Sequence, residues 1–189
     1  ALDTIANRLN VIIDEHGARA ILAMNYSGTL SLIAQFFPHR WMHCLGTSEV
    51  EYGTICNASG YVAWDLLFGG AEQGFDPRTA RDASCILVWG ANPSHSAPHA
   101  HKHWLKESPA KVIVVDPIRT LSAAEADLHL QPRPGTDAAL AFGILHALRE
   151  INALDQAFIA ENVLGFEDIE QFIDNCSPEQ CQTLTGVAA

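Results

Sequence analysis

Two short apolar runs, each followed by chain-breaking residues, decide the fold: CILVW at 85–89 before GANP at 90–93, and VIVV at 112–115 before DP at 116–117. Runs of this length that are apolar throughout are typical of strands buried on both faces of a parallel sheet. Residues 97–106, between the two runs, predict a helix. The stretch is therefore predicted to form a βαβ unit.

The pattern continues toward the C-terminus. A third short strand is predicted at 128–130, and Thr136 can cap the helix that follows the Pro-rich turn 131–135. The predicted helices span 137–150, 155–162 and 167–174, and a last one starts after Ser177-Pro178, where proline suits the first turn. This part of the chain is predicted to be α/β with a helical tail.

Toward the N-terminus, apolar residues recur at helical spacing from Leu2 to Ile13, with Gly17 just beyond them. A strand at 19–24 and a helix at 30–37, stopped by Pro38, follow. Gly, Ser and Thr are frequent at 46–60, which predicts an irregular connection. We place a boundary there, with a partial α/β lobe at 1–55 and a second lobe at 56–189. The predicted fold class is α/β, a Rossmann-like parallel sheet flanked by helices plus part of a second α/β lobe.

Composition excludes several classes. The chain has 189 residues, 48% of them hydrophobic, and a net charge of −11. Such an acidic chain without clustered Lys and Arg is not expected to bind nucleic acid. No apolar run approaches the roughly 20 residues that span a bilayer. The five cysteines show no C-x-x-C pair, which argues against a disulfide framework or a zinc ribbon. The chain starts without Met and is interpreted as an internal piece of a longer protein.

Candidate binding residues follow each predicted strand, because ligands of parallel sheets bind beyond the carboxyl ends of the strands. Gly90 lets a phosphate or a ring approach the backbone, Asp116 can accept hydrogen bonds from ribose hydroxyls, and Asp137 can pair with the N–H edge of guanine. Ordinary turns are the alternative, since Asn-Pro, Asp-Pro and Pro-Gly are common in loops. No G-x-G-x-x-G is present, which weakens the case for a simple Rossmann nucleotide-binding module.

Four stretches in succession resemble a known family. They are CILVWGANP (85–93), VIVVDP (112–117), TLSAAEAD (120–127) and RPGTDAAL (133–140). In order and spacing they resemble the signatures of molybdopterin oxidoreductases of the dimethyl-sulfoxide-reductase superfamily, and the resemblance extends over nearly the whole chain. It implies two-electron redox chemistry on a small-molecule substrate at a molybdenum or tungsten centre held by two molybdopterin guanine dinucleotides.

The resemblance also implies cofactor contacts in the three loops. The implied residues are Gly90, Ala91, Asn92, Pro93, His95, Asp116, Pro117, Arg119, Gly135, Thr136 and Asp137. One departure is visible, because many members have arginine directly after Asp-Pro, whereas here Ile118 intervenes and the arginine is Arg119.

Cys56 stands where the family supplies a protein ligand to the metal, which makes Cys56 and its neighbour Asn57 the candidate catalytic residues. A thiolate suits a centre already bound by dithiolene sulfurs. The alternative is a small buried apolar cysteine. Formate dehydrogenases of this family commonly have histidine after the ligand, so Asn57 argues against formate oxidation.

Further expectations rest on the resemblance. Electrons leave through an iron-sulfur cluster in an N-terminal segment that this chain lacks, toward an electron-transfer partner or subunit, so the isolated piece is expected to be inactive. The alternative is a non-catalytic paralogue that acts as a scaffold in an electron-transfer complex. The compartment stays open, with the cytoplasm slightly favoured over the periplasm. Four histidines, with His99 and His103 four residues apart, are interpreted as a partly solvated helix face and not as a metal site: His95, His99, His101 and His103.

Overall fold

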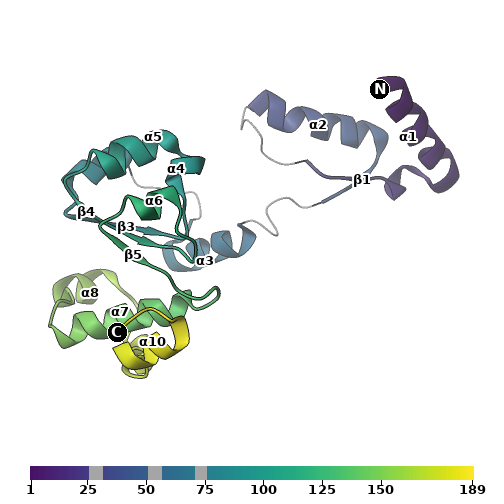
Figure 1. The fold of residues 1–189 in the computed structure, drawn as a ribbon. Helices are drawn as coiled ribbons and strands as arrows, with labels where there is room; N and C mark the ends of the chain where they lie inside the picture. Colours follow the sequence, from purple (N-terminus) through teal and green to yellow (C-terminus); the bar gives the residue numbers. More distant parts are fainter. Residues whose placement is uncertain (26–31, 51–56, 71–75) are drawn as a thin grey trace. The chain divides into compact units, whose positions relative to one another are not determined.

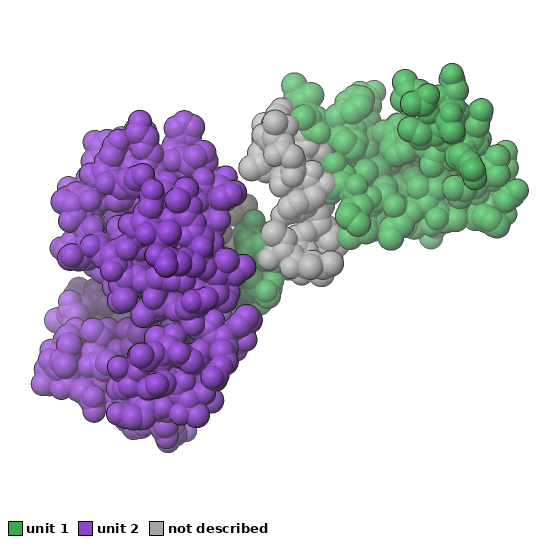
Figure 2. All heavy atoms as spheres, in the orientation of Figure 1, with its two compact units in different colours: residues 1–74 green, residues 75–189 purple. Residues whose placement is uncertain are grey.

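The computed structural model describes residues 1–25, 32–50, 57–70 and 76–189. The chain divides into two compact units, Ala1–Gly74 and Phe75–Ala189, which Figure 2 colours separately. The predicted boundary at residue 56, together with Cys56 itself, lies outside the described residues.

The described residues of unit 1 form helices and a pair of short parallel strands, in which Leu22 pairs with Ser48 and Ala23 with Glu49. Its elements are α1 (Leu2–His16), η1 (Ala18–Ala20), β1 (Leu22–Ala23), α2 (Leu32–Leu45), β2 (Ser48–Glu49) and α3 (Ala58–Phe68). Among the described residues of this unit, the buried hydrophobic side chains are Ala23 and Met42. Unit 1 therefore has a small core.

Three expectations for unit 1 need correction. The predicted strand 19–24 is reduced to β1, because a 3₁₀ turn occupies residues 18–20. Pro38 does not stop the second helix, since α2 continues through it to Leu45. Proline removes one N–H and crowds the preceding turn, which costs helix stability without forbidding continuation. The stretch 46–60 was predicted to be irregular because small residues are frequent in it, but it includes β2 and the start of α3.

Unit 2 is built on a three-stranded parallel sheet in the order β3-β4-β5. Its elements are η2 (Pro77–Asp82), β3 (Cys85–Trp89), α4 (Pro93–Ser96), α5 (Pro98–Ala100), the π-helical turn η3 (His101–Lys106), β4 (Lys111–Val115), α6 (Leu121–Ala124), β5 (Leu128–Leu130), α7 (Asp137–Glu150), α8 (Gln156–Asn162), α9 (Phe166–Asp174) and α10 (Pro178–Thr185). Figure 1 shows the short helices α4, α5 and α6 on one side of this sheet and the helical tail on the other. The predicted α/β class with parallel sheets flanked by helices is confirmed.

The helices of unit 2 bury the central strand from both sides. Val112 and Val114 pack with Ala123 of α6, while Val115 packs with Leu140 of α7. Successive side chains of a strand point to opposite faces, so β4 contributes to both clusters. β3 differs from the prediction of a strand buried on both faces, because Cys85 and Leu87 are exposed in the described part of the chain.

The helical tail follows the predicted boundaries closely, and local signals explain why. Ser177 and Gln180 form a capping box at the start of α10, with Pro178 at its first position. Asp155 caps α8 by accepting a hydrogen bond from the Phe158 N–H at 2.9 Å. α10 then packs against α7 through Cys181 and Leu140. None of the described helices is long and apolar enough to cross a membrane.

Candidate cofactor site

The three strands of unit 2 end at the same level. Trp89, the last residue of β3, pairs with Val115, the last of β4, and Val115 pairs with Leu130, the last of β5. The loops that start at residues 90, 116 and 131 therefore leave the sheet side by side at its carboxyl edge. In an open parallel sheet this edge is where ligands bind.

The first loop turns at Gly90, whose φ of 61° is costly for residues with a Cβ. The Gly90 N–H donates to the Val115 carbonyl at 2.9 Å, which ties the loop to β4. Asn92 then precedes α4 and accepts hydrogen bonds from the hydroxyls of Ser94, at 2.6 Å, and Ser122, at 3.2 Å. These bonds fix the loop between α4 and α6, so Asn92 positions the loop in addition to any contact it makes with a ligand.

Ser122, which lies within the third signature stretch, was not singled out from the sequence, whereas His101 was expected on the solvated histidine face and that expectation is wrong for it. Both are buried, and the Ser122 hydroxyl lies 3.4 Å from His101 Nδ1. His101 Nε2 lies 2.8 Å from a carboxylate oxygen of Glu125, whose other oxygen accepts from Lys106 at 2.9 Å. The hydrogen bond from Lys106, followed by that from His101, holds the pKa of Glu125 below its usual value. This polar network is connected to the first loop through the hydrogen bond from Ser122 to Asn92.

Two histidines of this region, His101 and His103, pair with carboxylates. His103 Nδ1 lies 2.8 Å from Glu107, one helical turn away, while His95 is exposed and its Nδ1 lies 3.3 Å from Asn92 Nδ2. The expected solvated face holds for His99 and His103, whereas His101 is buried.

The second loop is shaped by Asp116. Its carboxylate accepts from the Ile118 N–H at 2.8 Å, an Asx turn, and its carbonyl accepts from His129 Nε2 at 2.8 Å. The Asp116 N–H donates to the Leu130 carbonyl at 3.1 Å, which links the second loop to β5. Pro117 and Arg119 are exposed beyond this turn.

The third loop turns at Gly135, with a φ of 82°, and Thr136 then precedes α7. The Thr136 hydroxyl donates to the Arg133 carbonyl at 2.7 Å. The Arg133 guanidinium donates to the Thr183 carbonyl at 2.8 Å, at the C-terminal end of α10, where unpaired carbonyls and the helix dipole favour a cation. Arg133 therefore anchors the tail to the loop, a role the sequence did not indicate.

Asp137, at the start of α7, links the third loop to the end of β3 by a hydrogen bond. Its carboxylate accepts from the indole N–H of Trp89 at 2.7 Å, across 48 positions of sequence. The pairing of Trp89 with Asp137 could not be read from spacing, because it depends on the alignment of β3 with the start of α7. Asp137 remains exposed, so its carboxylate is accessible at the carboxyl edge.

Two pockets have walls that include residues of these loops. A pocket of about 570 Å³ lies between the second and third loops and is lined by residues that include Pro117, Gln131 and Arg133. Ala91 and Pro93 line another, apolar pocket of about 550 Å³ beside β3. Nothing lies within 4 Å of the positions where a Cβ would stand on Gly90 and Gly135. The edge is open to a phosphate or a ring, which fits the dinucleotide part of a cofactor.

The predicted contact residues thus occupy three adjacent loops of one sheet edge. Their contacts with a cofactor stay a prediction. Asn57 is the exposed residue directly before α3 in unit 1. Cys56, the predicted metal ligand, lies outside the described residues.

A parallel sheet whose loops meet at the carboxyl edge is the arrangement in which open α/β sheets bind nucleotide-like ligands. Residues 1–175 match the molybdopterin oxidoreductase family, and the chain belongs to this family. Membership implies a pterin cofactor that carries molybdenum or tungsten.

The chain is similar to proteins that carry several different enzyme names. It is 33% identical to the probable oxidoreductase YoaE of Bacillus subtilis over 100% of this chain and 28% of the relative. It is 29% identical to the nitrate reductase of Synechocystis sp., covering 100% of this chain and 27% of that protein. The solved structure of acetylene hydratase from Pelobacter acetylenicus superposes with a TM-score of 0.63 at 26% identity, over 98% of this chain and 25% of that one. The chain spans about a quarter of the length of these relatives.

Proposed function

We propose that this chain forms part of a molybdenum or tungsten enzyme that catalyses a two-electron redox reaction on a small substrate, and that its carboxyl-edge loops hold a molybdopterin guanine dinucleotide. The observation that supports the proposal is the alignment of β3, β4 and β5, whose last residues pair with one another. This alignment brings the implied contact residues into three neighbouring loops. The cofactor would supply the two-electron chemistry when bound.

The residues of the chain would bind and orient the dinucleotide. Gly90 and Gly135 leave room for its phosphates to approach the backbone, and Asp116 lies where a strand-end carboxylate can accept from a ribose. Asp137 would accept hydrogen bonds from guanine with the oxygen lone pairs that Trp89 does not use, because an ionised carboxylate has about four acceptor sites.

The proposal extends to two features beyond the described residues. Cys56 would bind the metal as a thiolate, and an iron-sulfur cluster in another part of the protein would pass electrons to a partner. In the protein that contains this chain, Cys56→Ala should abolish turnover and remove one sulfur from the metal's X-ray absorption shell. An unchanged sulfur shell would exclude Cys56 as a ligand.

Dinucleotide binding is tested with Asp137→Ala in the same protein. Released pterin and guanine nucleotide, measured per mole of protein, should fall because a guanine contact is lost. Asp168→Ala is the matched control, since Asp168 is likewise an exposed acid in the first turn of a helix, α9. Full occupancy in Asp137→Ala would contradict the guanine contact. A wild-type protein without metal or pterin would support a non-catalytic scaffold instead.

A further inference from the structure

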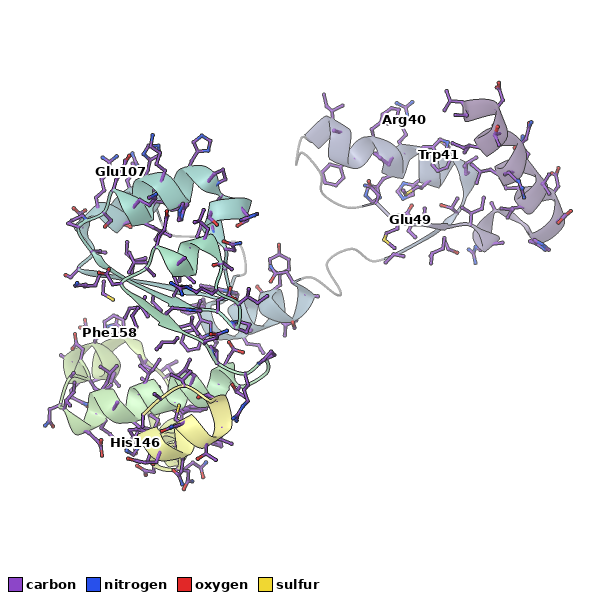
Figure 3. The ribbon with its side chains drawn as sticks, in the orientation of Figure 1. Arg40, Trp41, Glu49, Glu107, His146 and Phe158 are labelled. Atoms are coloured by element: carbon purple, nitrogen blue, oxygen red, sulfur yellow. The ribbon has the colours of Figure 1, made fainter. Side chains whose placement is uncertain are left out.

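Three potential metal ligands converge in unit 1. His39 and His43 come from α2 and Glu49 from β2, and one ligand atom of each lies within 4.8 Å of the others. His43 Nε2 is 3.1 Å from one Glu49 carboxylate oxygen, and His39 Nδ1 is 3.4 Å from the other. Figure 3 labels Glu49 on the strand that faces α2. No part of the carboxyl-edge site of unit 2 includes these residues.

The continuation of α2 through Pro38 creates the cluster. Residues four apart on a helix share a face, so His39 and His43 present their rings to the same side. The chain then turns at Gly46, with a φ of 73°, and returns as β2 beside the helix. A helix that ended at Pro38, as the sequence predicted, would have left both histidines in a loop.

Two of the three ligands, His39 and Glu49, are held in place by their surroundings. The Ser48 hydroxyl donates to the Arg19 carbonyl at 2.9 Å and the Val50 N–H to the Ala23 carbonyl at 3.1 Å, which fixes the backbone on both sides of Glu49. The His39 ring contacts Phe36, with ring centroids 5.9 Å apart. The side chains of His39 and Glu49 are 19% and 28% exposed, whereas that of His43 is 71% exposed, so the cluster is open to solvent on one side.

We propose that His39, His43 and Glu49 bind a divalent transition-metal ion of the zinc type. Two imidazoles and a carboxylate are a common ligand set for Zn²⁺, with water in the fourth position. Ligand bonds of about 2.0–2.2 Å in a tetrahedron place neighbouring ligand atoms roughly 3.3 Å apart. The histidine–carboxylate separations of 3.1 and 3.4 Å are close to this value. They reach different oxygens of Glu49, so the carboxylate would turn to place one oxygen on the ion beside both imidazoles.

This site differs in chemistry from the molybdenum or tungsten centre, where the proposed protein ligand is a soft thiolate. Nitrogen and oxygen ligands select a first-row divalent ion. Bound there, the ion joins α2 to β2 and stabilises a unit whose described residues bury few hydrophobic side chains. Without an ion, the same three side chains form histidine–carboxylate pairs, and the experiment must separate the two cases.

The test uses the 189-residue chain after treatment with a chelator. Calorimetric titration with Zn²⁺ should show one equivalent bound, and the affinity should fall at least about tenfold in His43→Ala and in Glu49→Gln. His103→Ala is the matched control, because His103 also pairs with a carboxylate but has no third ligand among the described residues. Cys44→Ser controls for the exposed thiol next to His43 and should leave the affinity unchanged.

Two direct measurements avoid any dependence on the folding of the variants. Zn²⁺ should shift the imidazole nitrogen resonances of His39 and His43 in the NMR spectrum of the wild-type chain. Co²⁺ in place of Zn²⁺ should give the visible absorption of a four-coordinate site without a sulfur-to-metal charge-transfer band. Unshifted His39 and His43 resonances at saturating Zn²⁺, a thiolate band, or loss of binding in Cys44→Ser would each overturn the proposal.

Discussion

Gly143 provides a stringent test of the packing in unit 2. It lies in the middle of α7, where a Cβ would stand 2.6 Å from Cys181 Sγ and 2.8 Å from Cys181 Cβ. Both distances are shorter than real Cβ contacts allow, so Gly143→Ala must push α7 and α10 apart. Cys181 is buried with Leu140 and Val115, so the displacement would reach the core that supports the sheet.

The magnitude follows from two opposing effects. Alanine stabilises a helix interior by about 1 kcal/mol relative to glycine. Overpacking a close-packed core costs about 1–3 kcal/mol, and the upper part of this range applies because the clash includes the Cβ of a helix residue, which cannot rotate away. We therefore expect a net loss of about 1–2 kcal/mol, which lowers Tm by about 4–8 °C for a unit of this size.

Differential scanning calorimetry measures the effect and can separate transitions of the two units. Cys181→Ala combined with Gly143→Ala should recover at least about 0.5 kcal/mol of the loss, because the sulfur is removed. Gly60→Ala in α3 is the matched control. Its Cβ would meet only the side-chain end of exposed Asn57, which can rotate, so stability should be unchanged or higher. An increase of Tm in Gly143→Ala would refute the close approach of α7 and α10.

Three further predictions concern polar groups of unit 2. The Val112 N–H of β4 and Lys111 donate to Asp127 and lower the pKa of its carboxyl. The ionised carboxylate therefore stabilises the fold above its ordinary pKa, and this effect is lost as the pH falls through the lower folded-state value. Asp127→Asn should be less stable than the wild type at neutral pH, and a stability difference that persists in acid unfolding curves would contradict this. Cys85 is exposed and should react quickly with iodoacetamide in the native state. Cys176 should react slowly, because burial raises the pKa of its thiol. Equal labelling of the two cysteines by mass spectrometry would be inconsistent with the burial of Cys176. Trp89→Phe should lower the free energy of unfolding in urea by about 1 kcal/mol, and by less in a protein that already carries Asp137→Ala. Equal losses in the two backgrounds would show that the hydrogen bond between Trp89 and Asp137 contributes nothing.

Local signals explain why the sequence predicted unit 2 well. The apolar run at 85–89 and the short run at 128–130 match β3 and β5, and the helix at 137–150 matches α7. Strand and helix periodicity, proline at helix starts and capping side chains all act within a few residues, so they can be read directly from the chain. The candidate loops follow from the same reasoning, because parallel strands present their carboxyl ends at one edge.

Unit 1 was predicted less well, for reasons that are also physical. Pro38 is a helix breaker by propensity, yet α2 continues through it, because tertiary context can outweigh a cost of about 3 kcal/mol. The short strands β1 and β2 exist because they pair with each other, and a run of two residues has no detectable period. α3 was concealed by the small residues around its start.

The sequence by itself determined the α/β class, the order of the elements in unit 2 and the family to which the chain belongs, because short-range patterns and signature spacing carry this information. Only the tertiary structure decided which side chains meet: Trp89 with Asp137, Arg133 with the end of α10, and the two histidines of α2 with Glu49. These contacts join positions on different elements, and their distances depend on how strands align and helices pack. The meeting of the three loops at one sheet edge could be predicted from the chain, because it follows from parallel strand order. The residues of the proposed zinc-type site could not be grouped from the sequence.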